Sequence, residues 1–163
     1  MARIADRMGR TKGSFYHHYK NKDELVAACY EWTFAIIDEV LGRIQVAGDY
    51  CRRLNHAISN LVRFQLDPSG PLLHTSGLFT LPSDKRDRFE DLFRLLSDDL
   101  TNLVVDGIID GSVRPVDPNI AALVLIPTVF SASELLEWFP DFANQQNSAE
   151  LYVRPFFKGI LSY

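Results

Sequence analysis

The chain has 163 residues, of which 47% are hydrophobic and 23% are charged, and its formal net charge is -4. This composition is ordinary for a soluble globular protein, and the length is enough to bury a substantial core in one main domain. The longest apolar run is interrupted by Pro127. This run is shorter than the roughly 20 residues that span a bilayer. The first residues contain no secretory signal. We therefore expect a cytoplasmic protein that does not bind membranes.

The charge is distributed unevenly along the chain. Residues 1–22 contain six lysines and arginines and a single acidic residue, which gives this segment a net charge of +5, whereas the rest of the chain carries -9. A cationic end on an acidic body is typical of a protein that meets nucleic-acid phosphates at one end only. A solvated basic helix would have the same charge, so charge alone does not decide between the two.

The pattern of apolar residues predicts an all-α fold. Turn-forming segments divide the sequence into helical stretches, and almost nothing alternates with the period of two that strands require. Residues 23–46 form the first long predicted helix, which is apolar on two faces and is therefore packed from two sides. Asn21 is its expected N-cap, and Asp23 and Glu24 lie in its first turn, where carboxylates complement the helix dipole.

Two further helices and one short segment follow. After a break at Gly48, a second helix continues to Asp67. Residues 72–79 have room for only a short helix, because prolines and glycines surround them. A third long helix begins at Ser83 and ends near Gly111, where we expect the left-handed conformation of a helix C-cap.

The last part of the chain contains two predicted helices. Asp117 followed by Pro118 has the pattern of an N-cap with proline at the first helical position, and apolar spacing then extends to Trp138. Pro127 should kink this helix. A polar stretch at residues 144–148 separates it from the final helix.

Residue types that carry chemistry elsewhere do not form a site in this sequence. Cys29 and Cys51 lie far apart without ligands at metal-binding spacing, so we expect buried, inert thiols. His17 and His18 point about 100° apart on a helix, which argues against a metal site. Phosphate-binding loops and catalytic motifs are absent. We therefore expect no metal, no cofactor and no enzymatic activity.

The informative motif is residues 4–25, IADRMGRTKGSFYHHYKNKDEL. It has the layout of two short helices around a turn at Gly9, with Thr11 as the cap of a second helix that runs to about Tyr19. The outward face of this second helix offers hydrogen-bond donors to phosphates or base edges, and a glycine on it allows DNA to approach closely. These residues are Thr11, Lys12, Gly13, Ser14, Tyr16, His17 and Lys22.

The motif resembles the signature of the tetracycline-repressor (TetR) family, approximately IA..aGvskgtlYrHFpsKeeL, with the same spacing throughout. The resemblance implies a DNA-binding transcriptional regulator that grips a double-stranded operator with the recognition helix at residues 11–17. It assigns phosphate contacts to Tyr16 and Lys22, and groove contacts to Thr11, Lys12, Ser14 and His17. His18 and Tyr19 would pack structurally. Arg10 departs from the family pattern, which has a small apolar residue at this position.

The resemblance also divides the chain. Residues 1–22 correspond to helices 2 and 3 of the family's DNA-binding domain, and residues 23–163 to a helical effector-binding and dimerisation domain whose connecting helix is residues 23–46. Roughly 25 to 30 residues precede the motif in family members, including a first helix that closes the three-helix core. We therefore expect that the true start lies upstream, that the arm is partly disordered, or that another chain covers its apolar face.

The implied mechanism is release from DNA by a small apolar ligand. The aromatic residues Trp32, Phe64, Phe79 and Phe130 are candidates to line its pocket, although simple core packing would also explain them, and His74 is a candidate contact from a loop. The last two helices are the expected homodimer surface. Because the two recognition helices must lie roughly 34 Å apart on DNA, a ligand that tilts residues 23–46 would lower operator affinity.

Two alternatives remain at this point. The chain could be a helical dimer that binds a small molecule but not DNA, because the first helix of the DNA-binding domain is missing. It could also be an enzyme in a helical bundle, for which the sequence offers no acid–base pair or metal constellation at useful spacing.

Overall fold

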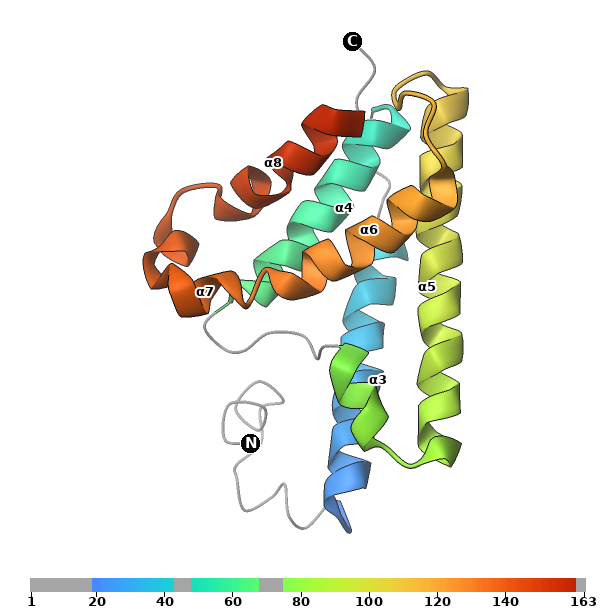
Figure 1. Ribbon diagram of the computed structural model, residues 1–163, viewed down its shortest axis with the longest axis vertical. Helices are drawn as coiled ribbons and strands as arrows, with labels where there is room; N and C mark the ends of the chain where they lie inside the picture. Colours follow the sequence, from blue (N-terminus) through green and yellow to red (C-terminus); the bar gives the residue numbers. More distant parts are fainter. Residues whose placement is uncertain (1–18, 43–47, 68–74, 161–163) are drawn as a thin grey trace.

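The computed structural model describes residues 19–42, 48–67 and 75–160 (Figure 1). In this part of the chain all regular elements are helices and there is no strand, which confirms the all-α prediction. The elements are α3 (Lys22–Gly42), α4 (Tyr50–Gln65), the 3-10 helix η1 (Thr75–Thr80), α5 (Ser83–Ile109), α6 (Pro118–Ser131), α7 (Leu135–Trp138), the 3-10 helix η2 (Pro140–Asn144) and α8 (Ser148–Ile160).

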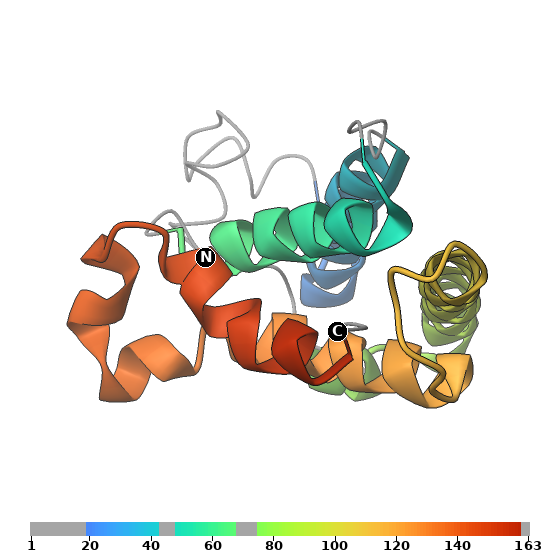
Figure 2. The same ribbon diagram turned by 90° about the horizontal axis from the view of Figure 1, so that it is seen from above.

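The helices form two layers. α3 and α5 run along the long axis of the molecule, and α6 crosses this axis in front of them (Figure 1). Seen from above, α6, α7 and α8 lie along one side, and α3 and α4 lie on the other (Figure 2). We call α6, α7 and α8 the front layer. α6 packs mainly against α5, and α8 packs mainly against α4.

The core lies between these layers. Leu54 and Ile58 of α4, Val104 of α5, and Ala122 and Leu125 of α6 are all completely buried. Burying a side chain of the leucine or isoleucine class stabilises the folded state by about 1.5–3 kcal/mol. This shared core joins α4, α5 and α6, and it holds the front layer in a fixed position relative to the rest of the chain.

Polar residues fix the helix starts that the sequence predicts. The Asn21 Oδ1 atom accepts a hydrogen bond from the backbone N–H of Glu24 at 2.9 Å, which confirms Asn21 as the cap of α3. The Asp117 carboxylate accepts the backbone N–H groups of Asn119 and Ile120 at 2.9 and 3.1 Å, as expected for the cap of α6. These contacts satisfy backbone donors that a helix start leaves unpaired.

Asp49 is the N-cap of α4 and accepts the Arg52 backbone N–H at 2.8 Å, and the turn after α5 adds further hydrogen bonds at the start of this helix. The Asp110 carboxylate accepts the backbone N–H of Tyr50 at 3.0 Å, and the Ser112 hydroxyl accepts the next N–H at 3.1 Å. Hydrogen bonds from the Ser112 hydroxyl and from the backbone N–H groups of Tyr50 and Ser112 lower the pKa of Asp110. Gly111 has a φ of 78°, which confirms the expected left-handed glycine.

Two predicted helix boundaries differ from the structure. The helix expected from Asp117 to Trp138 passes through Pro127 but ends at Ser131, so the single long helix was a wrong prediction. Hydrogen bonds of the i to i+3 type follow, as from the Glu134 N–H to the Ser131 carbonyl, and they tighten the chain before α7. The short segment expected at residues 72–79 is a 3-10 helix over its described part, Thr75–Thr80.

Both cysteines are buried free thiols, as the sequence predicts. Burial raises the pKa of Cys29. Burial, together with the nearby carboxylates of Asp49 and Asp110, raises the pKa of Cys51 to about 11. Both side chains therefore stay protonated near neutral pH, which is the unreactive form. None of the described helices combines the length and the hydropathy needed to cross a membrane.

Candidate functional site

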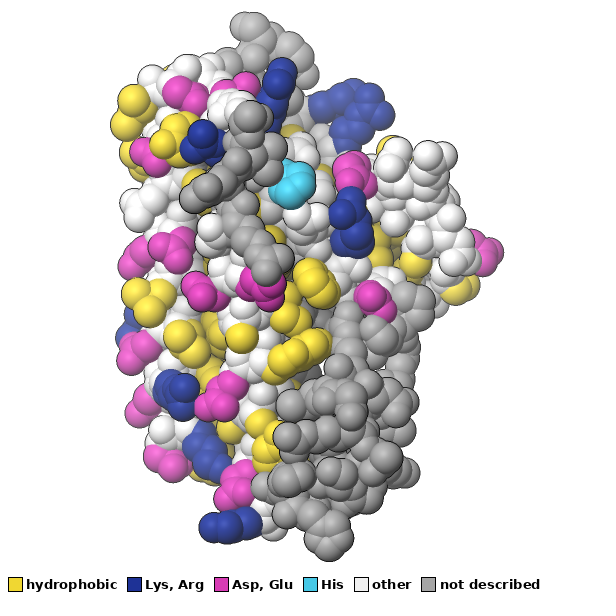
Figure 3. Space-filling model, turned by 180° about the vertical axis from the view of Figure 1, so that it is seen from behind, with side chains coloured by type: hydrophobic (Ala, Val, Ile, Leu, Met, Phe, Trp, Pro, Cys, Tyr) yellow, Lys and Arg dark blue, Asp and Glu magenta, His cyan; other side chains and the backbone are white. Residues whose placement is uncertain are grey.

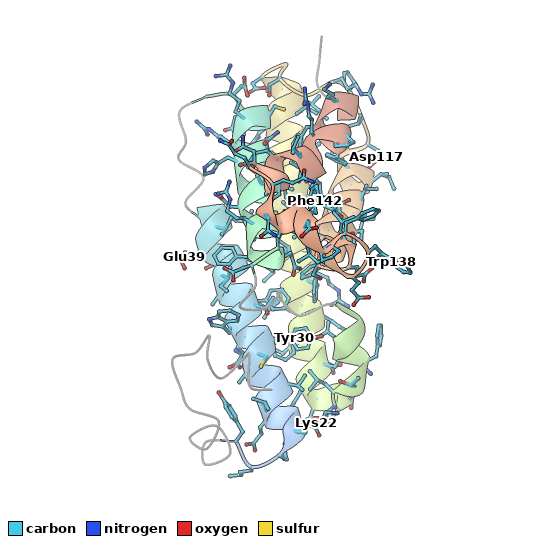
Figure 4. All side chains as sticks on the ribbon, turned by 90° about the vertical axis from the view of Figure 1, so that its left-hand side faces the viewer. Lys22, Tyr30, Glu39, Asp117, Trp138 and Phe142 are labelled. Carbon is cyan, nitrogen blue, oxygen red and sulfur yellow. The ribbon has the colours of Figure 1, made fainter. Side chains whose placement is uncertain are left out.

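The structure places one of the seven candidate DNA-binding residues. Lys22 is the exposed first residue of α3, at the lower end of the molecule in Figure 4. The other six, Thr11, Lys12, Gly13, Ser14, Tyr16 and His17, lie outside the described residues. The backbone N–H of Lys20 donates to the Glu24 carboxylate at 2.8 Å, and with the Asn21 cap this contact fixes the entry into α3.

α3 connects this end of the molecule to the interior. Its buried side chains point to more than one side, as the two-faced apolar pattern predicts, and they include Leu25, Cys29, Tyr30, Thr33, Phe34, Ile36 and Ile37. Tyr30 points from α3 toward the interior in Figure 4, whereas Lys22 and Glu39 lie near the two ends of the helix. A movement of α3 would therefore be transmitted to the core.

A chain of aromatic rings links α3 to α5 and α6. The Phe34 ring lies 4.8 Å from Phe93 and 6.2 Å from Phe89, and Tyr30 lies 5.2 Å from Phe89. Phe93 continues the chain to Phe130 at 6.0 Å. Rings at these separations attract one another beyond the area that they bury. We call these five residues the aromatic cluster.

The Tyr30 hydroxyl lies at a close contact with η1. A Cβ atom built on Gly77 would approach this hydroxyl to 2.5 Å, so the backbone of η1 sits directly against it. Burial raises the pKa of Tyr30 to about 12, so the hydroxyl is neutral at physiological pH. A side chain at position 77 would therefore have to displace the buried Tyr30 ring, α3 or η1.

An ion pair also joins α3 to α5. The Arg88 guanidinium lies 2.9 Å from the Glu31 carboxylate, and both side chains are largely exposed. An exposed pair of this kind adds at most about 1 kcal/mol to stability. Its importance is geometric, because it ties the two helices on the same half of the molecule as Lys22.

Gln65 is a buried polar residue that sequence reasoning did not single out. Its side chain is 1% exposed, and neither the Nε2 nor the Oε1 atom has a hydrogen-bond partner in the structure. Leaving a buried polar group unpaired costs about 1–3 kcal/mol, so such a group in a folded protein requires an explanation. The available signal was its place in the apolar stripe of α4, where Leu54, Ile58 and Leu61 precede it at helical spacing.

The candidate ligand residues fall in different environments. Phe130 belongs to the aromatic cluster and is buried, Trp32 is half-buried against the core, and Phe79 is 76% exposed on η1. Phe64 lines a cleft of about 440 Å³ between α3 and α4, together with Ile36 and Val40. His74 lies outside the described residues. The four described aromatic residues therefore do not surround one common cavity in this structure.

Two other hollows lie on the surface. A polar cleft of about 670 Å³ follows α4, and its arginines pair with carboxylates, Arg52 with Asp49 and Arg63 with Glu150. A groove of about 470 Å³ lies between α3 and α5, and Figure 3 shows the hydrophobic side chains gathered on this side of the molecule. The described residues contain no group of three or more His, Cys, Asp or Glu side chains placed to hold a metal ion.

Comparison with known proteins gives a family match for the start of the chain and a fold match for most of it. The family model for bacterial regulatory proteins of the tetR family matches residues 1–29. A solved tetR-family regulatory protein from Rhodococcus RHA1 superimposes with a TM-score of 0.73, covering 98% of this chain and 85% of that one, at 20% sequence identity. Residues 1–29 thus match the TetR family in sequence, and the described body has the fold of a solved TetR-family protein. The sequence match is confined to the segment that contains the motif, and the structural match extends over the body of the chain.

Further proteins show the same two kinds of likeness. The Transposon Tn10 TetC protein of Escherichia coli is 57% identical over 28 residues, which are 17% of this chain and 14% of that protein. The structure of AibR in complex with isovaleryl coenzyme A and operator DNA matches with a TM-score of 0.69 and 22% identity, covering 98% and 85% of the two chains. The ketosteroid transcriptional regulator KstR2 of Mycobacterium tuberculosis matches at 0.69 and 19%, covering 98% and 83%.

Proposed function

We propose that this chain is a cytoplasmic DNA-binding transcriptional regulator, a repressor that a small-molecule ligand releases from its operator. The observation that carries the proposal is the match of residues 1–29 to the TetR family model, in a chain whose body has the family fold. The matched segment includes the whole candidate recognition helix and leads directly into α3. Residues 1–22 have a net charge of +5, which suits contact with phosphates.

The proposed DNA contacts follow the motif. Tyr16 and Lys22 hold phosphates, and Thr11, Lys12, Ser14 and His17 reach the groove, where Gly13 allows close approach. The exposed position of Lys22 at the start of α3 supports its part of this assignment. The acidic body, which carries the remaining charge of -9, would keep the rest of the protein away from the duplex.

The proposed ligand enters the interior next to the aromatic cluster. An apolar ligand suits this position, because the cluster supplies apolar surface between α3, α5 and α6. Gln65, elsewhere in the buried core, is an unpaired donor and acceptor that a hydrogen-bonding group of a ligand would satisfy. Since the rings of Tyr30 and Phe34 belong to α3, a ligand that separates them from Phe89 would tilt α3. The recognition helices of a dimer would then leave the spacing that DNA requires.

The proposed homodimer forms through α6 and α8. Ile120, Leu123 and Val124 of α6 and Leu151 of α8 are large apolar side chains that are exposed in the single chain. Large exposed apolar side chains that gather on one helix, as the three of α6 do, are typical of an interaction site. A dimer also supplies the two recognition helices that a two-fold operator needs.

The first test is a titration of the full chain into labelled DNA from immediately upstream of its own gene, beside a scrambled duplex, at two salt concentrations. We expect saturable binding that prefers the native sequence and weakens steeply with salt. The variants Lys12→Ala and Lys22→Ala should weaken binding, and loss of a phosphate contact should reduce the salt slope by about 1. Arg94→Ala, which removes an exposed cation of α5, is the control.

Two outcomes would contradict the proposal. Equal, weak binding to both duplexes would show that this chain does not read DNA and would favour a dimer that only binds a small molecule. Specific binding that the Lys12 and Lys22 variants leave unchanged would remove the motif from the DNA interface.

A further inference from the structure

The outer face of α4 carries a row of polar side chains along the polar cleft of about 670 Å³. Other walls of this cleft come from Ser112 in the turn after α5 and from Glu150 at the start of α8. The volume lies within the range of small-molecule sites, about 300–1,000 Å³. The members of the row, at helical spacing along α4, are Arg52, Asn55, His56, Ser59, Asn60 and Arg63.

Hydrogen bonds among these side chains fix which atoms are donors. The Arg63 Nη1 atom donates to the Asn60 Oδ1 atom at 2.9 Å, and because a guanidinium can only donate, this contact identifies the amide oxygen. The Asn60 Nδ2 atom is therefore the donor in its 3.2 Å contact with His56 Nδ1, which places the proton of the neutral ring on Nε2. The Ser59 hydroxyl donates to the Asn55 Oδ1 atom at 3.2 Å, which leaves the Asn55 Nδ2 atom as a donor.

The same contacts engage the acceptors of the cleft. The amide oxygens of Asn55 and Asn60 and the Nδ1 atom of His56 each accept one of these hydrogen bonds. The Ser112 hydroxyl accepts a backbone N–H at the start of α4, at 3.1 Å. A solvated helix face would offer donors and acceptors alike, whereas the capacity that remains in this cleft is predominantly that of donors.

Each end of the cleft holds one arginine and one carboxylate. The Glu150 Oε1 atom accepts a hydrogen bond from Arg63, and the Oε2 atom is buried from solvent. At the other end, the Asp49 Oδ2 atom lies 3.7 Å from Arg52 Nε, which is too long for a hydrogen bond. Among the residues that the structure describes, none hydrogen-bonds to the Arg52 guanidinium, so all of its donors are available to a ligand.

The groups that a ligand would meet are therefore donors between two cations. Arg52 and Arg63 are eleven residues apart, which separates their backbones by roughly 16 Å along α4. Arg63 keeps the second N–H of each of its terminal nitrogens, and the Nδ2 atoms of Asn55 and Asn60 and the Nε2 atom of His56 lie between the two arginines in the row. Anionic oxygens form the strongest hydrogen bonds with such donors, and guanidinium groups suit carboxylates and phosphates.

We propose that the polar cleft of α4 binds a small oxygen-rich polyanion, a phosphate ester or a polycarboxylate. Arg52 and Arg63 hold its charged groups, and Asn55, His56 and Asn60 donate to the oxygens between them. The site is separate from the interior proposed for the apolar ligand, because the cleft lining that the structure describes contains no member of the aromatic cluster. A molecule bound here would be a second ligand of the protein.

The test follows the cleft itself, because the basic segment 1–22 also attracts anions. The full chain is labelled at histidine, and the His56 imidazole resonance is assigned by its loss in His56→Gln. Fructose 1,6-bisphosphate and citrate are the probes, and fructose is the neutral control, all at constant pH. We expect a saturable shift of the His56 resonance, with a Kd at or below about 1 mM for at least one anion and no shift with fructose. The tighter of the two probes identifies phosphate or carboxylate as the preferred group.

Two substitutions of nearly equal size test the donor pattern. Asn55→Asp and Asn60→Asp keep the oxygen that accepts from Ser59 or Arg63 and replace the donor nitrogen by a second carboxylate oxygen. Each should weaken binding at least about tenfold, because the new carboxylate repels the anion. Asn102→Asp, the same change at an exposed position of α5, is the matched control and should leave the Kd within about twofold.

Arg52→Gln gives an independent test that leaves the hydrogen-bonded row intact. The Arg52 side chain is 77% exposed, so its replacement should not affect folding, and binding should weaken about fivefold. Circular dichroism confirms that each variant is folded.

Two results would overturn the proposal. A His56 resonance that stays in place up to about 10 mM of both anions, or that moves equally with fructose, would show that the cleft does not select anions. Binding that the Asn55, Asn60 and Arg52 variants all leave within about twofold of the wild type would place the anion elsewhere on the chain.

Discussion

α5 and α6 pack against each other, yet their outward faces differ in kind. α5 carries charged side chains along its exposed face, and several of them pair, as Arg86 does with Glu90 at 3.2 Å and Arg94 with Asp91 at 2.6 Å. α6 carries no charge and exposes branched apolar side chains. The inner faces of the two helices, in contrast, are equally apolar.

The difference agrees with the proposed homodimer, in which the outer face of α5 meets water and the outer face of α6 meets the second copy. A helix that is apolar on one side and charged on the other is the usual solution for a helix at the surface of a globular protein. α5 follows this rule and α6 does not. The departure lies in the front layer, where we place the second copy of the chain, so the comparison can be tested by substitutions matched between the two helices.

The largest expected effect comes from the inner face of α5. Phe89 is buried and contacts Tyr30 and Phe34 of α3, so Phe89→Ala should lower the free energy of unfolding by about 3–5 kcal/mol. Urea denaturation followed by circular dichroism measures this loss. Arg94→Ala on the outer face should change stability by less than about 0.5 kcal/mol. A loss below about 1 kcal/mol for Phe89→Ala would show that the aromatic cluster does not hold α3 on α5.

Two leucines of equal exposure provide the sharpest comparison of the outer faces. Leu123 of α6 is 56% exposed and Leu95 of α5 is 59% exposed in the single chain. Leu123→Glu should raise the dimer Kd at least about 100-fold, because it places a carboxylate in the interface, whereas Leu95→Glu should leave it within about twofold. Sedimentation equilibrium measures both. Equal effects of the two substitutions would remove the distinction between the helices.

A smaller effect of opposite sign is expected inside the molecule. Gln65→Met replaces the unpaired amide by an apolar side chain of similar length, so it should raise the free energy of unfolding of the ligand-free protein by about 1–2 kcal/mol. Gln145→Met on the exposed connection after η2 should have no effect. Destabilisation by Gln65→Met would show that the amide is hydrogen-bonded in solution and is not held for a ligand.

The smallest expected effect concerns the hydrogen bond between Asp110 and the first residue of α4, and it depends on pH. The folded state lowers the pKa of Asp110, so its contribution to stability is complete above the unfolded pKa of about 3.9 and is lost as the pH falls through the lower folded value. Asp110→Asn should therefore lower the melting temperature at pH 7. The difference in melting temperature between this variant and the wild type should be smaller at pH 3. A difference that stays constant between pH 7 and pH 3 would contradict this role.

Local chemistry made much of the fold predictable from sequence. Asn21, Asp117 and Gly111 act on backbone groups within a few residues of themselves, so their roles can be recognised without knowing the tertiary structure. The end of α6 at Ser131 could not be recognised in this way. Ala132 and Glu134 keep helical φ and ψ angles, and the change to i to i+3 hydrogen bonds leaves the apolar spacing almost unaltered.

The same distinction between local and tertiary features applies to the candidate site. The motif at residues 4–25 is contiguous, so its resemblance to the TetR family could be read directly from the sequence. A ligand pocket is assembled from helices far apart in the chain, and aromatic composition alone does not tell an exposed Phe79 from a buried Phe130. Gln65 becomes significant only when the absence of a partner is visible, which requires coordinates.

The contact between Gly77 and the Tyr30 hydroxyl couples the position of η1 to the position of α3. Because the two groups touch without a side chain between them, any rotation of α3 must either push η1 or open a gap beneath it. A methyl group at position 77 would act as a fixed wedge. Gly77→Ala should therefore hold a folded protein in one tilt of α3, so that its operator affinity no longer responds to the ligand that releases the wild-type protein.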